Sequence, residues 1–474
     1  MRPVLEQSKR CFVPQSSKAI IGVPEARNLA RTMPKHCFRS EREVEEKKMM
    51  KMDYSSNPDT LIPGLRDSLA LQCLARVPRA YYPALRRVSR MWQGTLLGRQ
   101  LFKLRKDLGL QEPWIYVPFS SSSTCSSWLE AYDPVENVWH DIGTIPSTNP
   151  GEVLKCFAMV HIKERLFIIG GKISSKDGGD LYTSRKVRAL NTITGKWSQC
   201  ASMSVPRVDF ACTVCNGVIY VAGGRTGLRH ERGIDLAEAY VPAQNAWIPL
   251  PAMNIARYKC VGVTLERKVY VIGGFALAGS SSGINEEDDS LENDDAETMR
   301  YCCSPVDRSS VDVFDPAMGS WGLSRAMWQV DVPPNQIVAV EGVLYSSGDV
   351  LSAWKGRVEQ YDRGLNIWKI VNGSQRLQPV SRAENSRFWE SSRKWQQCYL
   401  TMAQVGKSSL YFIGGYRKAG HDDEGSGESY TMSDRGVALE VVSVFDTREG
   451  KWRSTETSSM AGKELCSHCC TLEL

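Results

Sequence analysis

The sequence has no run of about 18 apolar residues, the minimum for a helix that crosses a membrane. The residues after Met1 also lack the apolar core, roughly 7 to 15 residues long, that marks a secretory signal peptide. We therefore expect no membrane partner and interpret the glycosylation sequon at Asn372 as chance. The chain is expected in the cytoplasm, the nucleus or both.

Histidine is scarce, with 6 residues among 474, and no acid–base or nucleophilic triad suggests itself. Residues 279–283 match the letters Gly-x-Ser-x-Gly. They lie in a Ser- and acid-rich stretch, whereas a serine nucleophile needs a strand-to-helix elbow. We predict no catalytic residue and no cofactor.

The 15 cysteines are odd in number and spread from Cys11 to Cys470, which argues against a disulfide framework and favours a reducing compartment. Cys212 and Cys215 have the spacing of a metal-binding pair, but side chains three residues apart on a strand point to opposite faces. The C-terminal cluster of cysteines around His468 is interpreted as a buried strand. No metal site is therefore predicted.

Positive charge is concentrated at the N-terminus. Residues 1–52 hold 12 Lys or Arg against 6 Glu, which equals the net charge of +6 for the whole chain. We predict that residues 1–56 form a basic, disordered arm, with a nuclear-import or transit role as the alternative. The rest of the chain is neutral in sum, which argues against nucleic acid as the main partner because phosphate binding needs a basic face on a folded domain.

A short hydrophobic strand that ends in Gly-Gly occurs four times, at residues 166–171, 219–224, 269–274 and 410–415. Residues 343–348 are a degenerate fifth copy, and residues 114–119 occupy the same place in the first unit without glycine. Paired glycines allow close approach of strands and backbone angles that a side chain forbids. Asn216-Gly217 joins the second strand pair and is a strong hairpin signal.

Each strand is followed by a second anchor, a residue six positions before a tryptophan. In five of the six units that residue is Asp or Asn, which favours a turn because its side chain can bond the local backbone. The six pairs are Asp133 and Trp139, Asn191 and Trp197, Val241 and Trp247, Asp315 and Trp321, Asp362 and Trp368, and Asp446 and Trp452. Each unit is therefore predicted to be a four-stranded antiparallel sheet.

A period of about 50 residues with these two anchors resembles the kelch repeat, which implies a β-propeller. The resemblance covers residues 113–474. The first unit lacks its leading strand, and residues 466–474 supply a lone strand, so we predict a six-bladed ring closed by the C-terminus. An acidic insertion at about residues 275–310 carries no Lys or Arg between Phe275 and Met299 and is expected to be disordered.

Residues 57–110 change from strand to helix periodicity. The first helix has Asp67 as a candidate cap and Pro78 as a stop. Three helices are predicted from apolar positions: Leu65, Leu69, Cys73 and Val77; Leu85, Val88 and Trp92, with Pro83 in the first turn; and Leu97, Leu101, Leu104 and Leu108. The stretch from Leu61 to Trp92 closely resembles an F-box, and its order with the repeats resembles plant F-box/kelch-repeat proteins.

That resemblance implies the substrate receptor of a cullin-RING (SCF-type) ubiquitin ligase, which is not itself an enzyme. The F-box would bind a Skp-type adaptor and through it a cullin, and the propeller would bind the protein to be ubiquitinated. The adaptor-binding residues implied by position are Leu61, Ile62, Pro63, Leu65, Leu69, Leu74, Val88 and Trp92. Ile62, Pro63 and Leu65 would face the adaptor, and the core would be formed, with some adaptor contact, by Leu69, Leu74, Val88 and Trp92. Arg66 and Ser68 depart from the family pattern, which could weaken docking.

Substrate contacts are expected in two sets of propeller loops that, by resemblance, line one mouth of the channel. The candidate residues are Arg207, Arg225, Arg257, Tyr258, Tyr416 and Arg417. Arginine beside tyrosine suits a carboxylate- or phosphate-bearing peptide. The alternative is that these arginines only pair with neighbouring blades or backbone carbonyls. At the level of function the alternatives are a kelch scaffold outside a ligase and a kelch-fold enzyme.

Overall fold

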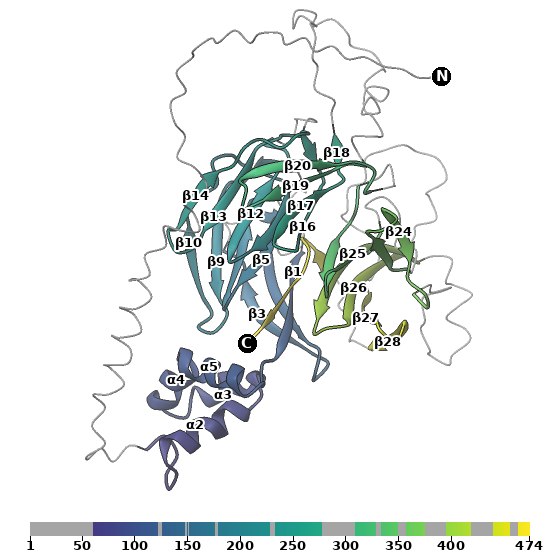
Figure 1. Ribbon diagram of the computed structural model, residues 1–474. Helices are drawn as coiled ribbons and strands as arrows, with labels where there is room; N and C mark the ends of the chain where they lie inside the picture. The colour runs from purple at the N-terminus through teal and green to yellow at the C-terminus, as the bar shows by residue number, and fades with distance from the viewer. Residues whose placement is uncertain are drawn as a thin grey trace, which may run out of the picture. The chain divides into compact units, whose positions relative to one another are not determined.

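The computed structural model describes residues 60–121, 126–146, 149, 151–175, 179–227, 233–276, 309–328, 333–348, 357–374, 395–418, 439–455 and 463–474. Among these residues, a group of short helices precedes a series of antiparallel sheets (Figure 1). The predicted arm at residues 1–56, the interior of the acidic insertion and the Gly-x-Ser-x-Gly pattern at 279–283 lie outside the described residues.

Six antiparallel sheets follow one another along the chain, and we number them as blades 1 to 6. Blade 1 contains β1 (Pro113–Ser121), β2 (Ser126–Asp133), β3 (Val138–Thr144), β29 (Glu464–Leu465) and β30 (Cys470–Glu473). Blade 2 contains β5 (Ala158–Ile162), β6 (Arg165–Ile169), β9 (Val187–Asn191) and β10 (Lys196–Cys200). Blade 3 contains β11 (Ala211–Cys215), β12 (Val218–Ala222), β13 (Ala237–Val241) and β14 (Ala246–Pro249).

The remaining blades repeat this pattern. Blade 4 contains β16 (Val261–Leu265), β17 (Lys268–Ile272), β19 (Val311–Asp315) and β20 (Ser320–Ser324). Blade 5 contains β21 (Ile337–Val340), β22 (Val343–Ser346), β23 (Glu359–Asp362) and β24 (Ile367–Ile370). Blade 6 contains β25 (Trp395–Val405), β26 (Ser409–Lys418), β27 (Leu439–Asp446) and β28 (Lys451–Thr455).

The innermost strands form a closed cycle. Contacts run from β5 to β11, β16, β21, β25 and β30 in turn, and β30 then contacts β5. The cycle closes through the C-terminus, because β30 pairs with β1 and places Leu472 opposite Trp114. Such closure removes the open edges that a linear array of sheets would leave. The predicted six-bladed propeller is therefore confirmed.

Three of the four predicted glycine pairs end a strand as expected, whereas Gly414-Gly415 lies within β26, which continues to Lys418. Gly170 and Gly171 have φ angles of 63° and 92°, which side chains rarely adopt. A Cβ atom on Gly170 would also lie 2.7 Å from the carbonyl oxygen of Arg207 in the next blade. Gly223-Gly224 and Gly273-Gly274 repeat both features.

The tryptophans link one blade to the next. All six lie on outermost strands, and in five blades each stands opposite a Tyr or Phe of the neighbouring strand. In four blades the indole N–H donates to a carbonyl at the end of the preceding blade: Trp247 to Ala201, Trp321 to Pro251, Trp368 to Met327 and Trp452 to Ser374, at 2.8 to 2.9 Å. Each tryptophan therefore adds an apolar body and one directed bond between blades.

The turn residues also perform their predicted role. The Oδ1 atom of Asp133 accepts from the backbone N–H of Val135 at 2.8 Å, which closes the turn between β2 and β3. Asn191, Asp315, Asp362 and Asp446 make the same bond in their own blades.

The helical module departs from the predicted three helices. It contains α2 (Asp67–Arg76), the 3-10 turn η2 (Arg79–Tyr81), α3 (Tyr82–Leu85), α4 (Arg90–Leu96) and α5 (Arg99–Asp107). The second predicted helix is divided because Ser89 is extended and its hydroxyl caps α4 by accepting from the N–H of Trp92. Asp67 is not a cap; its carboxylate accepts from the N–H of Leu61 at 3.0 Å and closes the turn before α2.

Two small sheets lie outside the blades. One is formed by β4 (Val153–Lys155), β7 (Lys172–Ser174) and β8 (Asp180–Thr183). The other pairs β15 (Arg257–Tyr258) with β18 (Phe275–Ala276). No helix among the described residues is long and apolar enough to cross a membrane.

Candidate docking face and axial cavity

The helical module exposes several large apolar side chains. Leu65 is 36% exposed, Leu69 49% and Val88 60%, and Met91, which the sequence reasoning missed, is 38% exposed. Leu69 and Val88 therefore do not lie in the core, and the adaptor contact that was also expected of them stays a prediction. The buried side of α2 is formed instead by Ala70, Leu74 and Ala75.

Other residues predicted in this region support the exposed ones. Leu61 and Leu74 belong to the module's core, and Ile62 packs partly against it. Trp92 donates its indole N–H to the carbonyl of Leu61 at 2.7 Å, which ties the start of α4 to the turn before α2. Pro63 is exposed in that turn. We call the surface of Leu65, Leu69, Val88 and Met91 the docking face.

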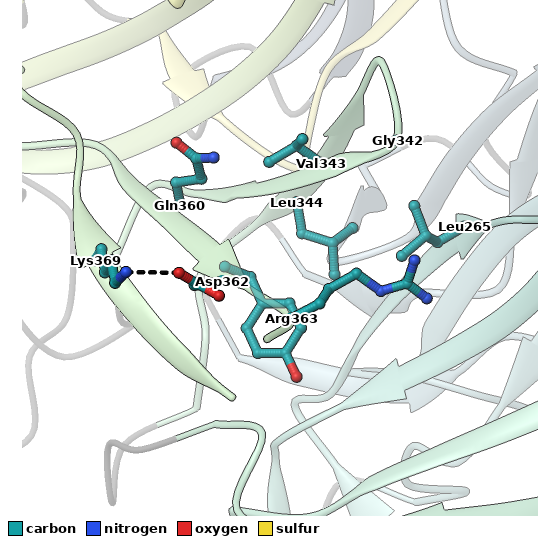
Figure 2. Close-up of a pocket in the computed structure, with 9 residues that line it drawn as sticks. Leu265, Gly342, Val343, Leu344, Gln360, Asp362, Arg363 and Lys369 are labelled. Atoms are coloured by element: carbon teal, nitrogen blue, oxygen red, sulfur yellow. Dashed lines mark hydrogen bonds and ion pairs between the residues drawn. The ribbon is translucent and has the colours of Figure 1, made fainter. Parts of the chain in front are cut away.

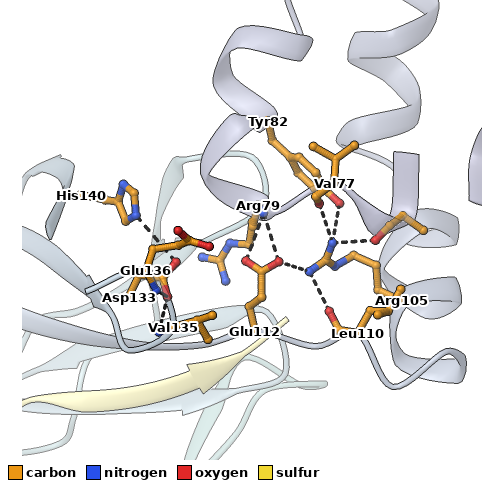
Figure 3. Close-up of polar contacts among 11 residues, drawn as sticks. Val77, Arg79, Tyr82, Arg105, Leu110, Glu112, Asp133, Val135, Glu136 and His140 are labelled. Carbon is orange, nitrogen blue, oxygen red and sulfur yellow. Dashed lines mark hydrogen bonds and ion pairs between the residues drawn. The ribbon is translucent and has the colours of Figure 1, made fainter. Parts of the chain in front are cut away.

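The module is joined to the propeller by a buried polar cluster (Figure 3). The carboxylate of Glu112 accepts from the backbone N–H of Arg79 at 3.1 and 3.2 Å and forms an ion pair with Arg105. Arg105 is almost fully buried and also donates to the carbonyls of Ala75 and Val77 at 2.8 and 2.9 Å. Burial raises the pKa of Tyr82, which lies beside Arg105.

On the propeller side of this joint, Arg79 inserts between the two parts. Its guanidinium lies 4.0 Å from the ring centroid of Trp114 and donates to the hydroxyl of Tyr116 at 2.5 Å. Arg86 reaches blade 2, where it donates to the carbonyl of Ile193 at 2.7 Å. The module is thus held on blades 1 and 2 by directed bonds.

Two arginines predicted to contact substrate are enclosed in the propeller. Arg207 and Arg257 have no exposed surface. Arg207 pairs with Glu238 at 3.0 Å and donates to the carbonyls of Gly223 and Leu236. Burial lowers the pKa of Arg207, an effect that Glu238 opposes.

Arg257 repeats the arrangement in the next blade. It pairs with Asp312 at 2.7 Å and donates to the carbonyls of Gly273 and Ser310 at 2.9 and 3.0 Å. Neither Arg207 nor Arg257 is available to a substrate, so their assignment as substrate contacts is corrected to the alternative, pairing within and between blades.

Other predicted substrate residues do come together. The carboxylate of Asp209 forms an ion pair with Arg225, whose guanidinium lies 5.0 Å from the ring centroid of Tyr258. Tyr258 in turn packs against Phe275 with ring centroids 5.3 Å apart. The side chains of Tyr416 and Arg417, on β26, lie outside the described residues.

This cluster borders a cavity of about 440 Å³, which we call the axial cavity and whose wall comes from five blades. Cys156, Asp209 and Lys259 line it from blades 2, 3 and 4, and each has a positive φ, between 53° and 56°, immediately before the residue that leads into the inner strand. The sequence reasoning missed Lys259 and Asp209, although both stand two residues after the repeated arginine. The repeat could have revealed them.

The cavity encloses titratable groups. His468 lines it with an exposed side chain, and the surrounding walls lower its pKa, which favours the neutral imidazole. Burial raises the pKa of Cys469, which disfavours its thiolate. No group of three or more His, Cys, Asp or Glu in the described part of the chain is arranged to hold a metal ion.

A second cavity, of about 430 Å³, lies between blades 4 and 5 and is lined by Leu265, Leu344 and charged residues of β23 and β24 (Figure 2). The charged side chains that line this cavity already form ion pairs: Lys369 with Asp362, and Arg363 with Glu266, both at 2.5 Å. Because these groups already have partners, the axial cavity is the better candidate for a ligand.

The comparisons with known proteins agree with this architecture. The model of the kelch motif matches residues 154–204 and 206–254, which cover blades 2 and 3. F-box/kelch-repeat protein At1g16250 of Arabidopsis thaliana is 34% identical over 48% of this chain and 61% of its own length. F-box/kelch-repeat protein SKIP30 of the same plant is 31% identical over 45% of this chain and 60% of its own length.

A longer match is found to F-box/kelch-repeat protein At1g26930 of Arabidopsis thaliana, which is 27% identical over 67% of this chain and 68% of its own length. The chain thus spans about three-fifths of the length of the more similar relatives and two-thirds of this one. These matches show that the chain is similar to plant F-box/kelch-repeat proteins, and the two matched kelch motifs coincide with blades 2 and 3.

Proposed function

We propose that the chain is the substrate receptor of an SCF-type ubiquitin ligase. In this role the docking face binds a Skp-type adaptor, which links the chain to a cullin, and the propeller binds the protein to be ubiquitinated. The chain would act as a non-catalytic subunit in the cytoplasm or the nucleus. The observation that carries the proposal is the exposure of apolar side chains on the helical module.

This exposure is concentrated on the module. Among the described residues, 6 of the 15 exposed large apolar side chains lie between residues 60 and 110. Scattered single apolar residues are normal on a surface, but a group on one small module marks a protein interface. The turn that begins at Leu61 and the start of α4 are tied together by Trp92, so Leu65 and Val88 belong to one region.

The joint also supports a receptor role. Glu112 binds both Arg79 and Arg105, and Arg86 binds blade 2, so the module does not depend on a flexible linker for its attachment. A partner bound to the module would therefore hold the propeller at a defined place. Ubiquitin transfer requires that the substrate be held within reach of the ligase, which such an attachment provides.

The direct test is binding of purified full-length chain to a purified Skp-type adaptor and cullin. Leu65→Asp combined with Leu69→Asp should weaken adaptor binding at least about 100-fold, because each leucine contributes roughly 1.5 to 3 kcal/mol when buried. Both side chains are exposed in the free chain, so folding should be unaffected. The matched control is Leu181→Asp with Leu236→Asp, two similarly exposed leucines of the propeller, which should bind adaptor normally.

Two outcomes would overturn parts of the proposal. Adaptor binding by the double variant at the wild-type level would exclude the docking face. Failure of the wild-type chain to bind any adaptor or cullin, or to support ubiquitin transfer to captured proteins, would exclude the ligase role and leave a kelch scaffold.

A further inference from the structure

Apolar and polar groups line the axial cavity in similar measure. The lining segments contain Phe157, Met159, Phe210, Val261 and Ile337, from blades 2 to 5, whose side chains pack in or against the blade cores. A volume of about 440 Å³ falls at the small end of ligand pockets, which span roughly 300 to 1,000 Å³. The cavity can therefore hold a small organic molecule or one or two side chains of a polypeptide.

The charged groups in and beside the wall carry a net positive charge. Asp209 and Lys259 are the charged residues that line the cavity, with His468 neutral near pH 7. Asp209 is already paired with Arg225. Lys259 makes no ion pair with any described residue, so the wall and its partner Arg225 carry one excess positive charge.

Lys259 is held in place at the rim. Its backbone has a φ of 54°, and its N–H donates to the carbonyl of Asp209 at 2.7 Å, which fixes the chain at this point. Its ammonium group lies 5.8 Å from the ring centroid of Phe275. The aromatic ring is a weak partner for a cation and leaves the ammonium able to bind an anion.

From this arrangement we propose that the axial cavity binds an anionic group, a carboxylate or a phosphate, carried on a small organic body, with Lys259 as the counter-ion. The organic body would lie among the segments that line the cavity, and Arg225, aligned by Asp209, would stand at the rim. Two sources share this chemistry: a free small acid, and an acidic or phosphorylated side chain of a bound polypeptide. The site belongs to the propeller and does not rest on the docking face.

The test uses full-length chain and calorimetric titration with pairs of probes that differ only in charge. Benzoate and phenyl phosphate should bind at least tenfold more tightly than benzamide, their neutral counterpart. Lys259→Gln should abolish that preference. The matched control is Lys163→Gln, because Lys163 is exposed, lies outside the cavity and has nearly the same φ, 53°.

A second variant tests the cavity itself. Ala158→Phe places a large side chain in the wall and should weaken binding of both anionic probes while leaving Lys259 in place. The melting temperature of each variant shows whether it is folded. Equal affinity for benzoate and benzamide, or unchanged benzoate binding by folded Lys259→Gln, would overturn the proposal.

A further arm separates the two sources. The probes are the capped peptide Ala-Leu-Glu-Leu-Ala, its phosphoserine counterpart and its glutamine counterpart. Binding of the charged peptides, lost in Lys259→Gln, supports a polypeptide side chain as the ligand. Binding of benzoate or phenyl phosphate alone supports a free small acid. Because neither arm involves the adaptor, failure here leaves the proposed ligase role standing, and the converse also holds.

Discussion

The propeller buries charged side chains, whereas the helical module exposes apolar ones. In the propeller, Arg207 and Arg257 are fully buried and paired with acidic residues of their own blades. In the module, Leu69 and Val88 are half or more exposed. Propeller stability thus depends on buried charge, whereas the module's candidate function depends on exposed apolar surface. The type of a residue therefore does not tell whether it contributes to stability or to function.

The largest effect is expected from breaking the closed ring of the propeller. Deletion of residues 466–474 removes β30, uncovers the edge of β1 and takes Leu472 and Leu474 out of the core. We expect the truncated chain to aggregate because an unpaired strand edge pairs with other molecules. Size-exclusion chromatography with light scattering measures this.

The control for the deletion is Glu473→Lys, a substitution at an exposed position at the end of the same strand. The substituted chain should remain monomeric. A truncated chain that stays monomeric with an unchanged melting temperature would show that the ring does not need its C-terminal strand.

The next largest effect concerns the two kinds of arginine. Arg257→Leu leaves Asp312 buried without its cation, and we expect a loss of about 3 to 5 kcal/mol in the free energy of unfolding. Arg225→Leu should cost about 1 kcal/mol or less, because its pair with Asp209 is partly exposed. Urea unfolding followed by tryptophan fluorescence measures both. Similar losses for the two variants would contradict the division between buried and rim arginines.

A smaller and local effect is expected at the joint. Glu112→Gln removes the negative charge that pairs with buried Arg105, and hydrogen bonds to a charged group are worth about 1.5 to 3 kcal/mol. Hydrogen exchange should become faster in α2 and α5 while blades 3 to 5 stay unchanged. The control is Glu136→Gln, at an exposed position near the joint, which should leave hydrogen exchange unchanged both in the helices and in the blades. Uniform acceleration across the blades would indicate that the joint stabilises the whole propeller.

The fold could be predicted because its signals are local and repeated. Asp or Asn six residues before tryptophan closes a turn with a backbone N–H two residues away, and Gly-Gly provides backbone angles that side chains rarely adopt. Ring closure could also be predicted, since the missing strand of blade 1 and the spare strand at the C-terminus can satisfy only each other. Four copies of the Gly-Gly strand end and five of the Asp or Asn turn made each of these signals stronger than any single motif.

Side-chain roles could not be predicted to the same extent, because they depend on partners far away in the sequence. Arg207 pairs with Glu238, 31 residues later, and no residue next to Arg207 in the sequence indicates that partner. Two apolar stripes run along α2 and the turn before it, one through Leu65 and Leu69 and the other through Ala70 and Leu74, and periodicity cannot tell which stripe faces inward. The small alanine side chain allows close helix packing, which is why its stripe is the buried one.

The smallest effect concerns charge around the docking face. Residues 61–110 contain 10 Lys or Arg and only 2 acidic residues, so the neutral sum of the chain outside its N-terminal arm hides a basic module. Seven of these cations are exposed: Arg66, Arg76, Arg87, Arg90, Arg99, Lys103 and Lys106. Charge of one sign accelerates association with a partner of the opposite sign, and salt screens it. We therefore predict that the adaptor surface is acidic.

Arg87 and Arg90 are next to Val88 and Met91 of the docking face. The double variant Arg87→Glu with Arg90→Glu should therefore slow association with the adaptor by about three- to tenfold at low salt, with little change in the dissociation rate. Lys103→Glu with Lys106→Glu, the same charge change on the exposed side of α5, is the matched control and should slow association less, because α5 carries no residue of the docking face. Stopped-flow measurements at about 50 and 500 mM salt should converge, since the Debye length falls from roughly 14 Å to about 4 Å. An association rate that is independent of salt would show that apolar contact alone governs docking, and an equal effect of the two variants would show that the whole module steers the partner.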